Sequence, residues 1–290
     1  MMKRYWLPVL VLMISMMLLL PAGCGVAEKG SGEDGEQLRI ASVMPSNTEI
    51  LFALGLGDAV VGVTDFCNYP PELAGAVEDG SIKSIGDSFN LNEELLVSLE
   101  PDLVLFGFAS DAIENLDNLG IKTEVIAPTS LEETYASIRR IGELTASEAA
   151  AEKLASDMEA AIEAIREKAA ALPEENKPRV LMLLDLDSLY VAGAGTLEDE
   201  LIAAAGGINM VDEEQYAQLS EEALIEGNPD IIVCTFPLKE RILSEKEGWK
   251  NLNAVMNEAI YDLDGDLLNR PGPRLAQGLE LLYGIFYPGQ

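Results

Sequence analysis

Apolar residues recur every three or four positions between Thr145 and Leu172, which is the spacing of one stripe along an α-helix. The stripe comprises Leu154, Met158, Ala161, Ile162, Ile165, Ala169 and Leu172. Alanine, the residue with the highest helix propensity, fills much of the remaining surface. Thr145 and Glu148 fit a capping box at the start, and Pro173 stops the run. The pattern predicts one long helix, roughly 40 Å from end to end.

Two segments on either side of this helix share one pattern of polar and apolar positions. Residues 92–105 and 220–233 each run from an acidic pair through an apolar helical segment and Pro-Asp into a short apolar strand. Within them, Glu94 and Glu222 lie 128 residues apart, and the rest of the pattern keeps that offset. The chain therefore repeats a unit before and after the long helix.

A second pair of segments supports the same division. Residues 49–55 and 200–206 each read as a short helix closed by glycine, the residue that best tolerates a left-handed cap. We infer an N-terminal lobe over residues 37–144, a connecting helix over 145–173 and a C-terminal lobe over 174–290.

Short apolar segments alternate with helical ones in both lobes, which predicts parallel sheets. The expected strands are 38–43, 59–64, 103–106, 122–126, 180–184 and 231–235, and residues 83–89 are expected to be a short strand with its loop. The fold class is therefore α/β, with two Rossmann-like lobes joined by one long rigid helix and a ligand cleft between them. In parallel sheets, ligands bind beyond the carboxyl ends of the strands.

Aromatic residues recur at these strand ends in both lobes, which predicts an aromatic cleft. Ser46 or Asn47 is also expected to cap the first helix. The candidate ligand-binding residues are Pro45, Ser46, Asn47, Phe66, Tyr69, Phe89, Phe106, Phe108, Leu186, Asp187, Tyr190, Phe236, Arg270 and Arg274.

The first 23 residues have the pattern of an export signal. Lys3 and Arg4 precede an apolar run, and Ala-Gly-Cys follows it. The run is too short for a typical membrane span. Its end resembles a bacterial lipobox, which implies cleavage before Cys24 and acylation of that cysteine; a secreted protein without lipid is the alternative. Residues 24–36 read as a flexible tether. We expect an extracytoplasmic protein anchored to the cell membrane by lipid.

The composition excludes several classes of partner. Asp plus Glu number 50 against 19 Lys plus Arg, and the formal net charge is −31. Such a chain repels nucleic acid and anionic membrane surfaces, and it disfavours strongly anionic ligands. Histidine is absent, which removes the commonest zinc ligand, so no metal site is expected. Cys67 and Cys234 fall in different lobes, and we expect both to be free thiols.

Four stretches together resemble one family of binding proteins. They are Pro45–Leu51, Val61–Asp65 with Tyr69–Pro71, Asn92–Asp102 and Arg270–Arg274. In this order they are similar to the helical-backbone substrate-binding proteins of ABC importers, which bind cobalamin, ferric siderophores and haem. The resemblance covers about residues 37–288. It implies a monomer that delivers a small metal chelate to a permease dimer with its ATPase, without an enzymatic activity or a cofactor of its own.

The same resemblance implies two docking residues. In this family, one acidic residue on each lobe enters a basic pocket on the permease, and the matching positions are Glu94 and Glu222. Their neighbours Glu93 and Glu221 are the alternatives. A simpler interpretation is that these carboxylates favour the positive end of a helix dipole.

The residues leave more than one ligand open. Val-Gly-Val-Thr-Asp with Tyr-Pro-Pro most resembles the cobalamin-binding branch, which predicts a corrinoid. That branch often has tryptophan in the cleft, whereas neither Trp6 nor Trp249 falls at a strand end here. A ferric siderophore remains open, with Arg241 as a further cation, and so does haem, with Tyr69 or Tyr190 as axial ligand.

Two other classes of protein are less well supported. The chain has no G-x-S-x-G and no G-x-x-x-x-G-K-[ST] motif, although paired carboxylates would suit glycoside hydrolysis. A cell-surface scaffold would leave the aromatic residues at the strand ends unexplained.

Overall fold

The computed structural model describes residues 37–289. Contacts divide the chain into Met1–Gln37 and a compact unit from Leu38 to Gln290. The predicted signal peptide (1–23), the tether (24–36) and Cys24 lie outside the described residues. Within the described range, none of the helices has both the length and the apolar character needed to cross a bilayer.

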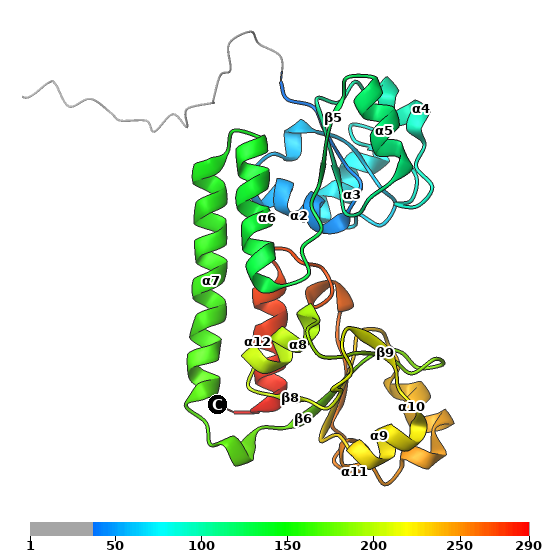
Figure 1. Cartoon of the computed structure of the whole chain (residues 1–290), viewed down its shortest axis with the longest axis vertical. Coiled ribbons are helices and arrows are strands. Elements are labelled where there is room, and N and C mark those ends of the chain that lie inside the picture. The colour runs from blue at the N-terminus through cyan, green and yellow to red at the C-terminus, as the bar shows by residue number, and fades with distance from the viewer. Residues whose placement is uncertain (1–36, 290) are drawn as a thin grey trace, which may run out of the picture. The chain divides into compact units, whose positions relative to one another are not determined.

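The N-terminal lobe is built on a five-stranded sheet (Figure 1). The strands pair in the order β3-β2-β1-β4-β5, and all neighbours are parallel, as predicted. The strands are β1 (Ile40–Ser42), β2 (Val60–Val63), β3 (Lys83–Ser84), β4 (Leu103–Phe106) and β5 (Lys122–Val125). The helices are α2 (Pro45–Ala53), α3 (Pro71–Glu78), α4 (Glu93–Ser98) and α5 (Asp111–Asn118), with a 3-10 turn, η1 (Gly57–Ala59).

The C-terminal lobe has a mixed sheet, ordered β11-β10-β6-β7-β9 with β8 beside β6. Its strands are β6 (Arg179–Asp185), β7 (Tyr190–Ala192), β8 (Ile208–Asn209), β9 (Tyr216–Gln218), β10 (Ile231–Cys234) and β11 (Ile260–Asp262). Its helices are α8 (Leu197–Ala204), α9 (Glu221–Gly227), α10 (Lys239–Glu245), α11 (Asn253–Met256) and α12 (Leu275–Phe286). The 3-10 turns are η2 (Glu174–Asn176), η3 (Glu247–Trp249) and η4 (Gly265–Leu267).

The prediction of a purely parallel sheet is wrong for this lobe. Strands β6 and β7 are antiparallel, and so are β7 and β9. Only residues 186–189 connect β6 to β7, and a connection that short cannot form the crossover that parallel strands require. The Asp185 side chain closes this turn by accepting the backbone N–H of Ser188 at 2.8 Å.

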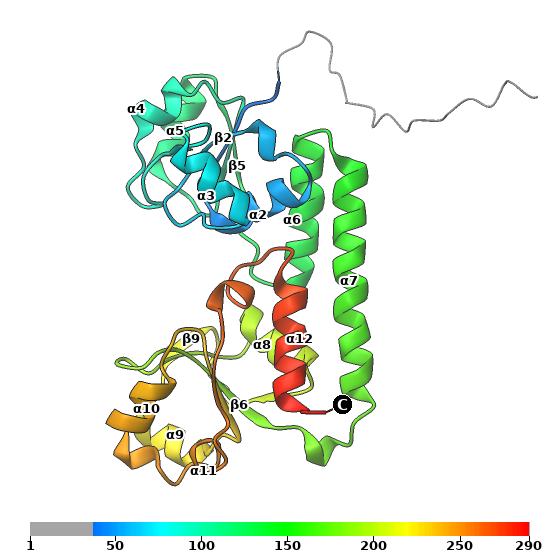
Figure 2. The ribbon, with the colours of Figure 1, turned by 180° about the vertical axis from the view of Figure 1, so that it is seen from behind.

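Two antiparallel helices, α6 (Leu131–Leu144) and α7 (Glu148–Ala170), pack side by side along one side of the molecule (Figures 1 and 2). The buried side of α7 carries the predicted stripe in its C-terminal half, with Met158, Ile162, Ile165 and Ala169. It contacts α6 on the N-terminal lobe and α8 and α12 on the C-terminal lobe. One continuous hydrophobic cluster therefore runs from the first sheet through the helices to the second.

The predicted start of this helix needs a correction. Helix α7 begins at Glu148, with Ser147 as its N-cap, so Thr145 does not form the expected capping box. The Thr145 hydroxyl instead donates to the Ile141 carbonyl at 2.7 Å and thereby closes the end of α6. Helices α6 and α7 lie very close together beside this turn, since a side chain on Gly142 would clash with the Ala151 methyl group. Small residues at both positions let the two helices approach closely.

Candidate functional site

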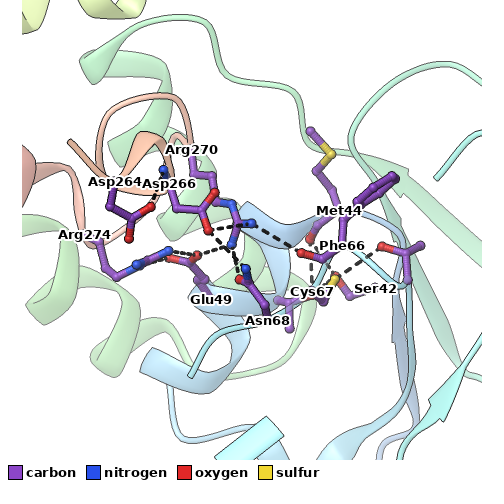
Figure 3. A network of polar contacts seen from close by, with 12 residues as sticks. Ser42, Met44, Glu49, Phe66, Cys67, Asn68, Asp264, Asp266, Arg270 and Arg274 are labelled. Carbon is purple, nitrogen blue, oxygen red and sulfur yellow. Dashed lines mark hydrogen bonds and ion pairs between the residues drawn. The ribbon is translucent and has the colours of Figure 1, made fainter. Parts of the chain in front are cut away.

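A buried carboxylate in α2 binds two arginines that come from the other lobe (Figure 3). Glu49 is only 3% exposed, and it accepts Arg274 Nε at 2.8 Å and Arg274 Nη2 at 2.6 Å. Arg270 Nη1 adds a third contact at 3.1 Å. The hydrogen bonds that Arg274 donates to Glu49 raise the pKa of the Arg274 guanidinium further above its ordinary value. Both arginines therefore share one buried carboxylate.

Arg270 also holds the loop that follows β2. Its guanidinium donates to the Asn68 side-chain oxygen at 2.7 Å and to the Phe66 carbonyl at 3.3 Å, and it pairs with Asp266 at 2.9 Å. Asn68 in turn donates to Asp266 at 3.2 Å. These residues follow β2 in one lobe and β11 in the other, so the carboxyl ends of the two sheets face each other. That is the edge where α/β sheets bind ligands.

The three arginines considered as ligand cations already have acidic partners. Arg274 and Arg270 bind Glu49, and the 8% exposure of Arg274 leaves it little surface for a ligand. Arg241 pairs with Asp187 at 2.8 Å and with Glu245 at 3.0 Å. Sequence patterns could not reveal this, because Glu49 and Arg274 are 225 residues apart.

The second lobe makes a related contact in the opposite direction. Glu200, in the segment that echoes residues 49–55, accepts the backbone N–H of Leu131 at 2.8 Å. Leu131 is the first residue of α6, the last helix of the N-terminal lobe, and Arg274 is the N-cap of α12, the last helix of the chain. Glu49 thus bonds to the start of α12 in the C-terminal lobe, and Glu200 bonds to the start of α6 in the N-terminal lobe.

Several of the residues predicted to contact the ligand are buried. They hold the elements around the site in place and present little surface of their own. The Asn47 side chain donates to the Phe106 carbonyl at 3.0 Å and lies between the ends of β4 and β5. Helix α2 starts at Pro45, so Ser46 and Asn47 lie within its first turn instead of capping it. Proline suits that first position because its missing N–H would have no helical partner. The buried members of the predicted set are Pro45, Ser46, Asn47, Phe106, Leu186 and Arg274.

Other predicted residues form exposed aromatic surface at the strand ends. Phe89 is 78% exposed and stacks on the half-buried Phe108, with ring centroids 5.3 Å apart. Phe66 is 51% exposed after β2, and Phe236 is 56% exposed after β10. The Tyr69 ring is covered by the Arg274 guanidinium, 4.1 Å from its centroid.

Tyr216 extends the aromatic surface of the C-terminal lobe, although its sequence context did not identify it. Its ring lies 5.9 Å from that of Tyr190, and its hydroxyl donates to Glu198 at 2.9 Å. Burial raises the pKa of the Glu198 carboxyl above its ordinary value. Tyr216 was missed because β9 is a three-residue strand in an acidic segment, with no clear apolar period.

The two predicted docking residues occupy equivalent positions in the structure. Asn92 caps α4 and Ser220 caps α9, each accepting a backbone N–H three residues on. Glu94 and Glu222 lie in the first turns that follow, and both are exposed.

The neighbouring carboxylates have partners within their own lobes. Glu93 accepts the Asn115 amide at 3.0 Å, and Glu221 pairs with Lys246 at 2.9 Å. Glu93 and Glu221 are therefore engaged within their own lobes, and Glu94 is exposed whereas Glu93 is half-buried.

Cys67 and Cys234 are free thiols, as expected, and both are buried. Burial, with a smaller contribution from Asp262, raises the pKa of Cys234 to about 12. Across residues 37–289, no group of three or more Cys, Asp or Glu side chains is placed to hold a metal ion.

Comparisons with known proteins agree with this geometry. The chain matches the family described as periplasmic binding protein over residues 40–267. It is 37% identical over 261 residues to an uncharacterized ABC transporter substrate-binding lipoprotein, YvrC, of Bacillus subtilis, with 87% of this chain and 81% of that protein covered. A cobalamin-binding protein of Halobacterium salinarum is 28% identical over 270 residues, with 88% and 70% covered.

Solved structures show the same architecture. The periplasmic heme-binding protein RhuT of Roseiflexus, solved in apo form, superposes with a TM-score of 0.77 at 31% identity. The match covers 87% of this chain and 98% of that one.

Proposed function

The chain belongs to the periplasmic binding protein family, and we propose that it is the ligand-capturing subunit of an ABC importer for a corrinoid. A protein of this family carries a ligand to a transporter and catalyses no reaction. The ligand would lie between the facing carboxyl ends of the two sheets. A ferric siderophore or haem, bound by the same architecture, is the alternative.

The observation that carries this proposal is the pair of stacked aromatic rings that each lobe presents. Phe89 and Phe108 present stacked rings on one lobe, and Tyr190 and Tyr216 present stacked rings on the other. Aromatic faces bind large, flat and largely apolar molecules. These phenylalanines and tyrosines take the place of the tryptophan common in the cobalamin-binding branch, since Trp249 is buried.

The charges near this surface favour a nearly neutral ligand. Haem carries carboxylates, and many ferric siderophores are anionic, so both need cations that are free to meet them. The arginines of this region are already paired with Glu49, Asp266 and Asp187. A corrinoid has neutral amides at its rim and does not need such cations. The similarity to a cobalamin-binding protein of Halobacterium salinarum supports the same choice.

Haem binding has a specific observation in its favour as well. The chain is 31% identical to RhuT, which binds heme, and Tyr190, the first residue of β7, is 39% exposed. A tyrosine in that position could serve as an axial ligand. Tyr69 is less suitable, because the Arg274 guanidinium covers its ring.

Delivery to the transporter would use Glu94 and Glu222. Both are exposed at the start of equivalent helices, where they could enter basic pockets on the permease dimer. Attachment to the cell membrane would use a lipid on Cys24, which the similarity to a lipoprotein of Bacillus subtilis supports. We assign the protein to the extracytoplasmic side of the membrane, acting as a monomer.

The proposal is tested by titrating the purified full-length chain with cyanocobalamin, hemin and ferrichrome, followed by gel filtration. Stoichiometric co-elution of the red corrinoid, with weak binding of the other two probes, is expected. Tight binding of hemin or ferrichrome, without binding of cyanocobalamin, would move the ligand to the corresponding alternative.

A further inference from the structure

Helices α6, α7 and α8 border an open pocket of about 420 Å³ where the two lobes meet (Figure 1). Its polar lining residues are Glu132, Tyr135, Arg166 and Glu200, and its apolar ones are Leu131, Ala203 and Ala204. None of them belongs to the predicted ligand-binding set. Pockets of about 300–1,000 Å³ hold small organic molecules, so this one has room for a ligand of its own.

The Tyr135 hydroxyl is available to a molecule in this pocket. The residue is 6% exposed, and no group within residues 37–289 hydrogen-bonds to its hydroxyl. That oxygen is nevertheless absent from the fully enclosed polar atoms without a partner, so it keeps accessible surface. Burial raises the pKa of the phenol to about 12, and at neutral pH it therefore has a proton to donate.

The Arg166 guanidinium supplies the positive charge of the pocket. Its side chain is 44% exposed, and its only ionic partner in the described part of the chain is Glu163, at 3.7 Å. That distance is too long for a hydrogen bond. Of the charged groups around Tyr135, Arg166 acts most strongly on the phenol. The two side chains can therefore donate to one anionic group, such as a carboxylate.

Two carboxylates of the pocket have no cationic partner among the residues that the structure describes. Glu132 lies exposed in the first turn of α6. Glu200 is half-buried and accepts the backbone N–H of Leu131. Both carboxylates act on the Tyr135 phenol, so they lie close to the same space. The pocket thus has donors for an anion and acceptors for a cation.

In the other lobe, the equivalent carboxylate is paired with arginines. Glu49 and Glu200 begin the two similar helical segments, and each bonds to the start of the other lobe's final helix. Glu49 binds the guanidiniums of Arg274 and Arg270, whereas Glu200 bonds to an uncharged N–H. A guanidinium from outside the chain would give Glu200 the kind of partner that Glu49 already has. The net charge of −31 also favours a cationic group.

We propose that this pocket binds a free basic amino acid with the chemistry of L-arginine. The guanidinium of the ligand donates to Glu200 and Glu132. Its α-carboxylate accepts from Arg166 and from the Tyr135 hydroxyl, and its carbon chain lies against Leu131 and the two alanines. A simple anion or a simple cation would leave one set of these charges unmatched. The site goes beyond the proposed function, because it does not depend on which chelate binds between the sheets.

The test is isothermal titration calorimetry of the purified full-length chain with L-arginine, L-citrulline and agmatine. L-Citrulline has a neutral urea in place of the guanidinium, and agmatine lacks the carboxylate. Tyr135→Phe, Arg166→Gln and Glu200→Gln each alter one proposed contact, and glutamine at 200 keeps an oxygen for the Leu131 N–H. Lys153→Gln is the matched control, because Lys153 is an exposed cation elsewhere on α7.

The wild-type chain is expected to bind L-arginine with a stoichiometry of one. Each pocket variant should bind it about tenfold more weakly, the size of one lost hydrogen bond, and the control should bind it normally. L-Citrulline and agmatine should bind the wild type more weakly than L-arginine does. Without ligand, Tyr135→Phe should be as stable as the wild type, because its hydroxyl has no protein partner.

Three results would overturn the inference. One is the absence of any heat of binding at millimolar L-arginine. Another is equal binding by the wild type and all three pocket variants, which would place the amino acid elsewhere. The third is agmatine binding as tight as that of L-arginine, which would show that no carboxylate is recognised and would favour the arginine side chain of a partner protein. The cyanocobalamin titration tests the proposed function separately from all three.

Discussion

Replacing Glu49 with glutamine tests the ion pairs that join the two lobes. The wild-type carboxylate is 3% exposed and accepts three hydrogen bonds from Arg270 and Arg274. Glutamine keeps one oxygen acceptor, but it removes the negative charge and turns an N–H₂ group toward a guanidinium. Arg274 is then left with only the weaker influence of Asp264 and Asp266, which precede it at the η4 turn, while its side chain stays buried.

The expected loss of stability can be worked out from these contacts. Removing one partner of a buried ion pair costs about 3–5 kcal/mol. Arg270 keeps Asn68, the Phe66 carbonyl and Asp266, and this places the loss at about 3 kcal/mol, the low end of that range. For a body of this size, that corresponds to a fall in melting temperature of roughly 6–12 °C.

Urea denaturation of the full-length chain, followed by circular dichroism, measures the change. Glu245→Gln is the matched control, because Glu245 pairs with Arg241 on the surface, and it should leave the midpoint unchanged within error. The double variant Glu49→Met with Arg274→Met should recover at least half of the loss, since buried ion pairs are often replaceable by apolar side chains. A loss below about 1 kcal/mol for Glu49→Gln would refute the reasoning, because it would mean that water or rearrangement already screens the pair.

Three further predictions concern docking, pH dependence and the aromatic surface. Joint replacement of Glu94 and Glu222 by alanine should abolish uptake of cyanocobalamin by cells while the purified chain still binds it; normal uptake would exclude these residues from docking. Burial raises the pKa of Glu198, so the stability that this group contributes is present below its ordinary pKa of 4.5 and is lost as the pH rises through the higher folded value. Glu198→Gln should therefore match the wild type at about pH 4 and be more stable than it at about pH 7.5 in urea titrations, and equal stabilities at both pH values would contradict this assignment. Phe89→Ala should weaken cyanocobalamin binding without altering stability, because its ring is 78% exposed, whereas Phe106→Ala should cost about 3–5 kcal/mol through the cavity left in the core; the reverse pattern would show that the two roles were assigned wrongly.

The sequence predicted the parts of the fold that depend on local periodicity. The apolar stripe of α7, the five parallel strands of the first sheet and the glycine turns at Gly55 and Gly206 all follow from patterns within a few residues. The start of α7 was missed because Thr145 satisfies a capping pattern but bonds back into α6 instead. Local patterns do not show which of two neighbouring helices a polar residue will join.

The candidate site was predicted less completely, because it depends on contacts distant in sequence. The Arg-Pro-Gly-Pro-Arg segment suggests a site for an anionic ligand as long as its acidic partner is unknown. Nothing in the sequence around Glu49 indicates that this residue is the partner. Exposure is equally hard to predict from the sequence. Phe89 and Phe106 were both expected at strand ends, yet Phe89 is 78% exposed and Phe106, the last residue of β4, is fully buried. Tyr216 reaches the site through an antiparallel strand that no apolar period marks.

The most direct test of the account is a crystal structure of the protein grown with cyanocobalamin. We predict that the corrin ring lies between the Phe89 and Phe108 pair and the Tyr190 and Tyr216 pair, with Arg270 and Arg274 still bound to Glu49. A corrinoid bound elsewhere, or arginines turned away from Glu49 toward the ligand, would contradict it.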